Sequence, residues 1–281
     1  MATRPVYLPK ESYPYYIQWD VDFEYNKGLS ASQKQKNIMA IHDKFRNVFP
    51  ESDVLEISRK SLSELGVSLS AFNLKMYVPS IGKEICVENI YQGGKVFENG
   101  MNYPDLYHLS PKDAKRDERL KSSGKIVGFR FEGKDFPANP VNAFYDYIYI
   151  SALSKNEQLA KEVVKYDGFT DIEFNPKTGL NCQARAAAVF TSLYRLGLTD
   201  KLDDFNEFLR ILNSFPQQII NETTGNTADT LTISEGDEII HKVYGKGKVT
   251  AVSENAINVT FVSGIQKKLS KAWAEENCKL S

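Results

Sequence analysis

The sequence predicts a mainly α-helical protein with a few short strands, followed by a small all-β barrel at its C-terminal end. Apolar residues recur at steps of three and four along most of residues 1–216, which is the period of helices with one buried face. The run NETTGNTADT, which begins at Asn221, is polar and aperiodic, and short alternating runs follow it. We therefore expect a helical domain over residues 1–216, a linker over 217–233 and an SH3-like or Tudor-like barrel over 234–281.

The expected helices have recognisable ends. Ser30 and Gln33 have the spacing of a capping box, and the helix that they begin should stop before Pro50. A short strand is expected at Val54–Ile57. The periodicity predicts later helices around Phe144–Ala152, from Cys182 to a cap at Gly197, and from Asp200 toward Pro216. In the barrel, strands are expected at Glu238–Val243, Gly247–Val252, Ile257–Val262 and Lys267–Leu269.

A helix predicted from Val87 to Phe97 carries three polar residues, Glu88, Gln92 and Lys95, along one edge. It also contains Gly93 and Gly94. A glycine in a helix interior costs about 1 kcal/mol relative to alanine, so the pair indicates close approach of another backbone or of a ligand. Each polar residue alone is also typical of an exposed helical edge.

The charge balance excludes a strongly basic nucleic-acid-binding protein. The chain of 281 residues has 35 Lys and Arg against 36 Asp and Glu, a net charge of -1. Local positive charge is concentrated between Lys112 and Lys125, where six basic residues face three acidic ones. This segment could hold phosphates, or it could be a solvated helical face of mixed charge.

Three cysteines, Cys86, Cys182 and Cys278, lie about a hundred residues apart, which suits neither a disulfide framework nor a metal site. We expect no metal and no cofactor. The first twenty residues lack the pattern of a signal peptide, and the apolar runs are too short to span a bilayer. We therefore expect a cytoplasmic protein without a membrane partner.

General catalytic motifs are absent from the sequence: it contains no GxSxG, GxxxxGK[ST], GxGxxG or HExxH. Instead, polar residues are embedded in apolar segments that follow one another in the order LEISRKS, LSAFNL, GKEICVENIYQGGKVF, SPKDAKRD and FTDIEFNPKTGLNCQARAAAVF. This order resembles the NADAR (YbiA-like) superfamily over roughly residues 4–215, in the subgroup that accompanies DarT toxins. The chain departs from the commoner pattern at Ala71 and Asn89, where many relatives have Asn and His.

The resemblance implies a mainly helical fold and an antitoxin that removes ADP-ribose from guanine in DNA, with ADP-ribosylated DNA as its partner and the cognate DarT toxin as a further candidate partner. It also implies that Lys60 is the reactive lysine and Glu88 the acidic catalytic residue. Further residues of the quoted motifs are expected to bind the substrate: Asn73, Gln92, Lys95, Lys115, Asp171, Asn181 and Arg185. The C-terminal segment EGDEIIHKVYGKGKVTAV resembles a Tudor-like module, and a docking or DNA-tethering role is expected by analogy.

The chemistry of N-glycosidic cleavage suits a carboxylate beside a lysine. Breaking the bond from C1'' to nitrogen passes through an oxocarbenium-like state, which a nearby carboxylate stabilises. The amine of Lys60 could attack C1'' and form a Schiff base, or as a cation it could hold a hydroxyl or phosphate. Two other functions remain open: an N-glycosidase acting on a small pyrimidine nucleotide of the riboflavin pathway, and a non-catalytic antitoxin that binds ADP-ribose or the toxin.

Overall fold

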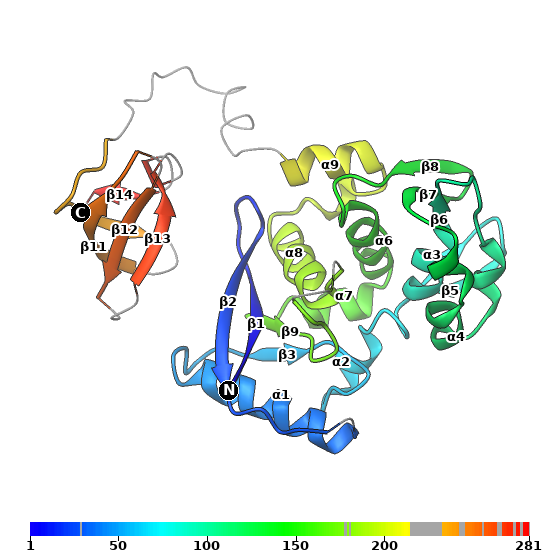
Figure 1. Ribbon diagram of the computed structural model, residues 1–281, viewed down its shortest axis with the longest axis horizontal. Helices are drawn as coiled ribbons and strands as arrows, with labels where there is room; N and C mark the ends of the chain where they lie inside the picture. The colour runs from blue at the N-terminus through cyan, green and yellow to red at the C-terminus, as the bar shows by residue number, and fades with distance from the viewer. Residues whose placement is uncertain are drawn as a thin grey trace. The chain divides into compact units, whose positions relative to one another are not determined.

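The computed structural model of the chain describes residues 1–28, 30–176, 179, 181–213, 232–241, 245–254, 256–262, 266–271, 274, 275 and 278–280. The chain divides into two compact units, Met1–Ile220 and Asn221–Ser281, each of which is described by itself (Figure 1). Within the described ranges, no helix is long and apolar enough to cross a membrane.

A four-stranded sheet with the order β2-β1-β9-β3 forms one end of the first unit. Strands β1 (Ala2–Pro9) and β2 (Tyr16–Phe23) form an antiparallel hairpin. Strands β3 (Val54–Glu56) and β9 (Gly168–Thr170) pair in parallel, and Tyr7 of β1 pairs with Phe169 of β9. The sheet therefore joins the beginning of the chain to segments that lie far along the sequence.

Two helices cover this sheet. Helix α1 (Ala31–Arg46) buries Ile38, Ile41 and Phe45 in one core with Val6 of β1. Helix α8 (Gln183–Arg195) belongs to the larger core, together with Tyr7 of the same strand. Because neighbouring strand residues point to opposite faces, α1 and α8 lie on opposite faces of the sheet (Figure 1).

The rest of the first unit surrounds helix α6 (Ala143–Ser154), which is buried on nearly all sides. Around it lie a two-stranded sheet, β4-β5, a three-stranded sheet, β6-β7-β8, and several short helices. These elements are α2 (Glu64–Ser68), β4 (Lys75–Val78), β5 (Lys83–Cys86), α3 (Val87–Gly94), β6 (Lys95–Phe97), η1 (Pro104–His108), α4 (Pro111–Arg116), α5 (Arg119–Ser122), β7 (Ile126–Phe131), β8 (Lys134–Pro137), α7 (Glu157–Val163), η2 (Thr199–Lys201) and α9 (Phe205–Asn213).

The prediction of a mainly helical fold is wrong, because the described part of the first unit is mixed α/β, with three small sheets. The strands of these sheets are short, and β1 contains prolines at positions 5 and 9 that hide its alternating pattern. The β7-β8 hairpin turns at Glu132 and Gly133, whose φ angles are 51° and 70°. An Asp-Gly or Asn-Gly pair would have signalled this turn more strongly than Glu-Gly does.

Several predicted helix ends are confirmed. The Ser30 hydroxyl accepts a hydrogen bond from the Gln33 N–H at 3.2 Å, and α1 ends at Arg46, before Pro50. Gly197 follows α8 with a φ of 67°, and its N–H donates to the Tyr194 carbonyl, which is the geometry of a glycine cap.

Helix α3 is shorter than expected, since it ends at Gly94 and the chain continues as strand β6. A Cβ on Gly93 would lie 2.6 Å from the Tyr107 ring, and one on Gly94 would lie 3.2 Å from the Arg130 carbonyl. The two glycines therefore allow η1 and β7 to approach α3 closely. The approach of these protein segments, and not of a ligand, accounts for the pair.

The second unit is a five-stranded antiparallel sheet with the order β13-β12-β11-β10-β14, built around Ile239, Val249 and Phe261. Its strands are β10 (Glu238–His241), β11 (Gly245–Val252), β12 (Ala256–Phe261), β13 (Gln266–Ser270) and β14 (Lys279–Leu280). Two residues of β14 pair with β10, and β13 and β14 do not pair with each other among the described residues. The expected closed barrel is therefore wrong. Of the expected linker at 217–233, residues 217–231 lie outside the described residues.

Candidate functional site

A cavity of about 600 Å³ opens in the first unit, between α3, α4, the turn that precedes β4 and the segment that leads into α8. Its volume falls within the usual range of small-molecule sites, about 300–1,000 Å³. The cavity is lined by Arg59, Ser70, Phe72, Glu88, Tyr91, Gln92, Lys112, Lys115, Arg116, Tyr145, Asp171, Glu173, Phe174, Asn175, Gly179, Asn181 and Gln183.

The first turn of α3 is fixed by backbone and amide hydrogen bonds. The N–H of Glu88 donates to the carbonyl of Ala71 at 2.9 Å. The N–H of Ala71 in turn donates to the side-chain oxygen of Gln183, whose amide nitrogen donates to the carbonyl of Ile57 at 2.7 Å. One glutamine thus joins the end of β3, the turn before β4 and the start of α8, and so places Glu88 at the cavity.

Glu88 is buried at 5% exposure and belongs to a chain of polar contacts. Its Oε1 accepts a hydrogen bond from Gln92 Nε2 at 2.8 Å and lies 3.6 Å from Lys115 Nζ. The Oε1 of Gln92 accepts from Lys95 Nζ at 2.6 Å. Burial lowers the pKa of Lys95 to about 8, with Lys115 adding to the effect and Glu88 opposing it. These contacts place the Glu88 carboxylate between the amide of Gln92 and the ammonium group of Lys115.

Aromatic side chains complete the walls around Glu88. The Tyr91 and Tyr145 rings meet edge to face at 5.4 Å between centroids. Burial raises the pKa of Tyr145 well above its usual range, and the charges of Glu88 and Asp171 add to this, so its hydroxyl stays protonated. On another wall, the guanidinium of Arg59 lies 4.2 Å and the ammonium of Lys115 lies 5.1 Å from the centre of the Phe72 ring.

A second carboxyl group, that of Asp171, also lines the cavity. Its Oδ1 accepts hydrogen bonds from the backbone N–H groups of Glu173 at 2.9 Å and Phe174 at 3.1 Å. Burial raises the pKa of Asp171, and the neighbouring buried carboxyl of Glu56 raises it further, against the effect of the two backbone hydrogen bonds. Asp171 is therefore held toward its protonated form.

Glu56 is held behind the cavity wall by buried polar contacts. Its Oε2 accepts from the Thr170 hydroxyl at 2.6 Å and its Oε1 accepts from the N–H of Ile172 at 2.8 Å. The Thr170 hydroxyl also lies 2.9 Å from His42 Nε2. Burial lowers the pKa of His42 to about 4, so the ring stays neutral at ordinary pH.

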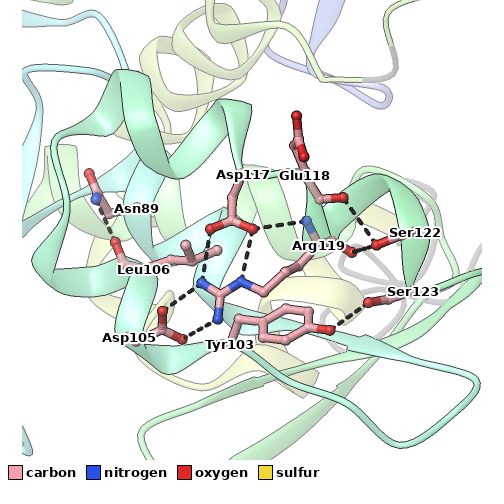
Figure 2. A network of polar contacts seen from close by, with 9 residues as sticks. All are labelled: Asn89, Tyr103, Asp105, Leu106, Asp117, Glu118, Arg119, Ser122 and Ser123. Carbon is pink, nitrogen blue, oxygen red and sulfur yellow. Dashed lines mark hydrogen bonds and ion pairs between the residues drawn. The ribbon is translucent and has the colours of Figure 1, made fainter.

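A polar network anchors α3 and α4 to each other through η1 (Figure 2). The amide nitrogen of Asn89 on α3 donates to the carbonyls of Leu106 and Leu109 at 2.8 and 2.9 Å. The guanidinium of Arg119 donates to Asp105 at 2.6 Å and to Asp117, at the end of α4, at 2.9 Å (Figure 2). The helix of Glu88 and the helix of Lys115 are thereby held to one shared element.

Of the nine predicted site residues, five line the cavity: Glu88, Gln92, Lys115, Asp171 and Asn181. Lys95 joins them through its hydrogen bond to Gln92, although it does not line the cavity itself.

The other three predicted residues lie elsewhere. Lys60 is half-buried, its N–H donates to the Ser58 hydroxyl at 3.1 Å, and it is not part of the cavity lining among the described residues. Asn73 is exposed, and its side chain donates to the Val67 carbonyl. Arg185 forms a buried ion pair with Asp146 at 2.9 Å, beside a separate, smaller pocket of about 220 Å³. The predicted pairing of Lys60 with Glu88 is therefore absent from the contacts of the described residues.

Sequence reasoning missed Arg59 and the aromatic wall of Phe72, Tyr91 and Tyr145. Arg59 is the neighbour of Lys60 in the segment SRKS, and of these two residues it is Arg59 that lines the cavity. The aromatic residues lie at helical or turn positions that are typical of core residues, and no sequence signal distinguishes them.

The comparison with known families gives the class of the protein first: residues 2–221 match the NADAR antitoxins that accompany DarT1. Because this match covers more than half of the chain, the chain belongs to the DarT1-associated NADAR antitoxin family. A comparison with curated proteins finds no match. The family match confirms the NADAR part of the predicted resemblance, and the Tudor-like module beyond residue 221 stays a prediction.

Proposed function

We propose that this antitoxin hydrolyses the N-glycosidic bond between ADP-ribose and guanine in DNA, and so reverses the modification made by its cognate DarT1-type toxin. The observation that carries the proposal is the buried carboxylate of Glu88, which lines the cavity and lies 3.6 Å from Lys115 Nζ. A fixed, buried carboxylate is the group that a cationic, oxocarbenium-like transition state requires. Family membership supports the antitoxin role, and the cavity supports the chemistry.

The reaction divides between two carboxyl groups. The bond from C1'' of the ribose to the guanine nitrogen breaks, and its electron pair goes to the nitrogen. Asp171, which is held toward its protonated form, is suited to give a proton to the departing base. Glu88 stabilises the positive charge at C1'' and takes a proton from the water that adds there. The products are ADP-ribose and unmodified guanine.

The other lining groups suit the polar parts of ADP-ribose. Lys115 carries a positive charge beside Glu88, and it can contact a hydroxyl or an oxygen of the diphosphate. Gln92 and Asn181 offer amide groups on the same cavity, which can orient ribose hydroxyls. Their roles are to bind and orient, while Glu88 and Asp171 act on the bond itself.

The position of Lys60 favours attack by water over a Schiff base. A nucleophilic lysine must reach C1'', and Lys60 is outside the cavity lining among the described residues. Lys95 has the lowered pKa expected of a nucleophilic amine. Its Nζ, however, donates a hydrogen bond to Gln92, which lies between Lys95 and Glu88. The water route therefore needs the fewest rearrangements of the contacts described above.

The direct test is release of ADP-ribose from a single-stranded DNA oligonucleotide that carries ADP-ribosylated guanine, followed by chromatography. We expect the full-length protein to release ADP-ribose and to leave intact guanine. Binding of the modified oligonucleotide without any release would favour the non-catalytic antitoxin, and release only from small pyrimidine nucleotides would favour the metabolic N-glycosidase.

A further inference from the structure

The mouth of the cavity carries positive charge that the protein itself does not neutralise. Four cations line the cavity, Arg59, Lys112, Lys115 and Arg116, and three of them are exposed at its edge without an ion pair among the described residues. Lys115 is the fourth, and it is paired with Glu88. The three form what we call the basic rim: Arg59, Lys112 and Arg116.

The carboxyl groups of the cavity are already engaged by other partners. Glu88 is paired with Lys115, Glu173 forms an ion pair with Lys34, and Asp171 accepts two backbone hydrogen bonds. No acidic side chain of the cavity is thus left to balance the basic rim within the described part of the chain. Unbalanced cations around a concave site attract an anionic ligand.

The basic rim is held in place by the fold. Lys112, Lys115 and Arg116 have the i, i+3, i+4 spacing that puts side chains on one face of a helix. Helix α4 is fixed at its start by the Ser110 hydroxyl, which accepts from the Asp113 N–H at 3.2 Å, and at its end by the ion pair of Asp117 with Arg119.

Arg59 is fixed by a contact with an aromatic ring outside α4. Its guanidinium lies 4.2 Å from the centre of the Phe72 ring, a cation–π contact that limits its rotamers. The basic rim thus presents charge from two separate segments, α4 and the residues after β3.

We propose that the basic rim binds the phosphates of the DNA strand on either side of the modified guanine, and does not bind the diphosphate of ADP-ribose. The proposal rests on the proposed function. A base that enters a cavity leaves its flanking phosphates at the mouth, which is where these exposed cations lie. The cation that lies beside the buried carboxylate is Lys115, and it is better placed to serve ADP-ribose.

The basic rim can be tested without turnover by measuring the binding of an unmodified single-stranded DNA oligonucleotide. The measurement is fluorescence anisotropy at several salt concentrations. Each neutralised phosphate contributes about -0.7 to the slope of log affinity against log salt for a single strand. Three contacts therefore predict about a 20-fold loss of affinity between 50 and 200 mM salt. For the Lys112→Gln/Arg116→Gln variant, one remaining contact predicts a loss of only about threefold.

The matched control is Lys121→Gln/Lys125→Gln, which removes two exposed cations of the same basic segment that do not line the cavity. This control should keep the salt dependence of the wild type. The proposal would be overturned if the two double variants weakened DNA binding equally, or if neither weakened it. It would also be overturned if the wild type did not bind the oligonucleotide.

Turnover on two substrates separates strand phosphates from the diphosphate. In the rim variant, kcat/KM on an ADP-ribosylated oligonucleotide should fall about tenfold, while kcat/KM on ADP-ribosylated guanosine should stay within twofold. An equal fall on both substrates would assign the rim to ADP-ribose and contradict the proposal. If the wild type shows no turnover, the proposed function fails, and the anisotropy series still decides the role of the basic rim.

Discussion

Replacing Glu88 by Gln isolates the charge of the buried carboxylate. Glutamine has nearly the same shape and can still accept the hydrogen bond that Gln92 donates to Glu88 at 2.8 Å. The change removes the negative charge 3.6 Å from Lys115 Nζ. It therefore tests whether the carboxylate stabilises the cationic transition state or only supports the local structure.

The cost of the lost ion pair to stability is small. Two unit charges at this distance attract by about 4–5 kcal/mol at an effective dielectric constant of about 20. Lys115 is 56% exposed, so solvent screens most of this attraction, and we expect a loss of unfolding free energy of about 1 kcal/mol or less. The fold should survive, and thermal unfolding should show a shift of only a few degrees.

The cost to catalysis is much larger. Loss of the group that stabilises the developing charge should lower kcat by about a hundredfold or more, which corresponds to about 2.7 kcal/mol of transition-state free energy. Single-turnover release of ADP-ribose from the modified oligonucleotide measures this step directly. A Glu88→Gln protein that folds and keeps kcat within threefold of the wild type would refute the assignment of Glu88.

Four further changes test other parts of the site and fold. Glu56→Gln removes one cause of the raised pKa of Asp171, so the fall of kcat at high pH should begin at a lower pH than in the wild type; an unchanged pH profile would argue against Asp171 as proton donor. Protonation of His42 favours the unfolded chain, because its folded pKa lies below the unfolded value, so its contribution to stability should be lost as pH falls from about 6.5 toward 4, by up to about 1.4 kcal/mol per unit. The difference in melting temperature between wild type and His42→Gln should change across that window, and parallel pH curves would contradict this. Lys60→Arg should keep kcat within about threefold, whereas lost turnover with retained binding, together with borohydride trapping of the wild type alone, would restore the Schiff-base route. A chain truncated after Ile220 should fold and keep its turnover on a short oligonucleotide; unfolding or inactivity would show that the boundary between the two units is wrongly drawn.

Local features of the site were predictable because they depend on neighbours in the sequence. The spacing of Glu88 and Gln92 puts them one turn apart on α3, and the structure joins them by a hydrogen bond at 2.8 Å. The cap of α1 at Ser30 follows from the same kind of local rule. The charge count indicated the region that contains Lys115, although it could not identify the partner of that lysine.

Features that depend on long-range contacts were not predictable. Glu56 forms a hydrogen bond with Thr170, which lies 114 positions further along the sequence. No motif spacing therefore predicts the buried carboxyl that raises the pKa of Asp171. The parallel pairing of β3 with β9 brings these segments together, and strands of three residues give almost no periodic signal. The choice between Arg59 and Lys60 was equally hidden, because it depends on which of two adjacent side chains faces the cavity.

The two departures from the commoner NADAR pattern, Ala71 and Asn89, concern the support of the site. Both residues are buried, and neither lines the cavity among the described residues. Ala71 acts through its backbone, which links Gln183 to Glu88, so the side chain at this position need not be polar. Asn89 uses one amide nitrogen to hold two carbonyls of the η1 region, and thereby positions α3 relative to the cations of α4. A histidine ring nitrogen offers a single N–H, so it could not donate to both carbonyls in the same geometry. Both positions therefore support the placement of α3, which carries Glu88, and neither contributes a side chain to the cavity lining among the described residues.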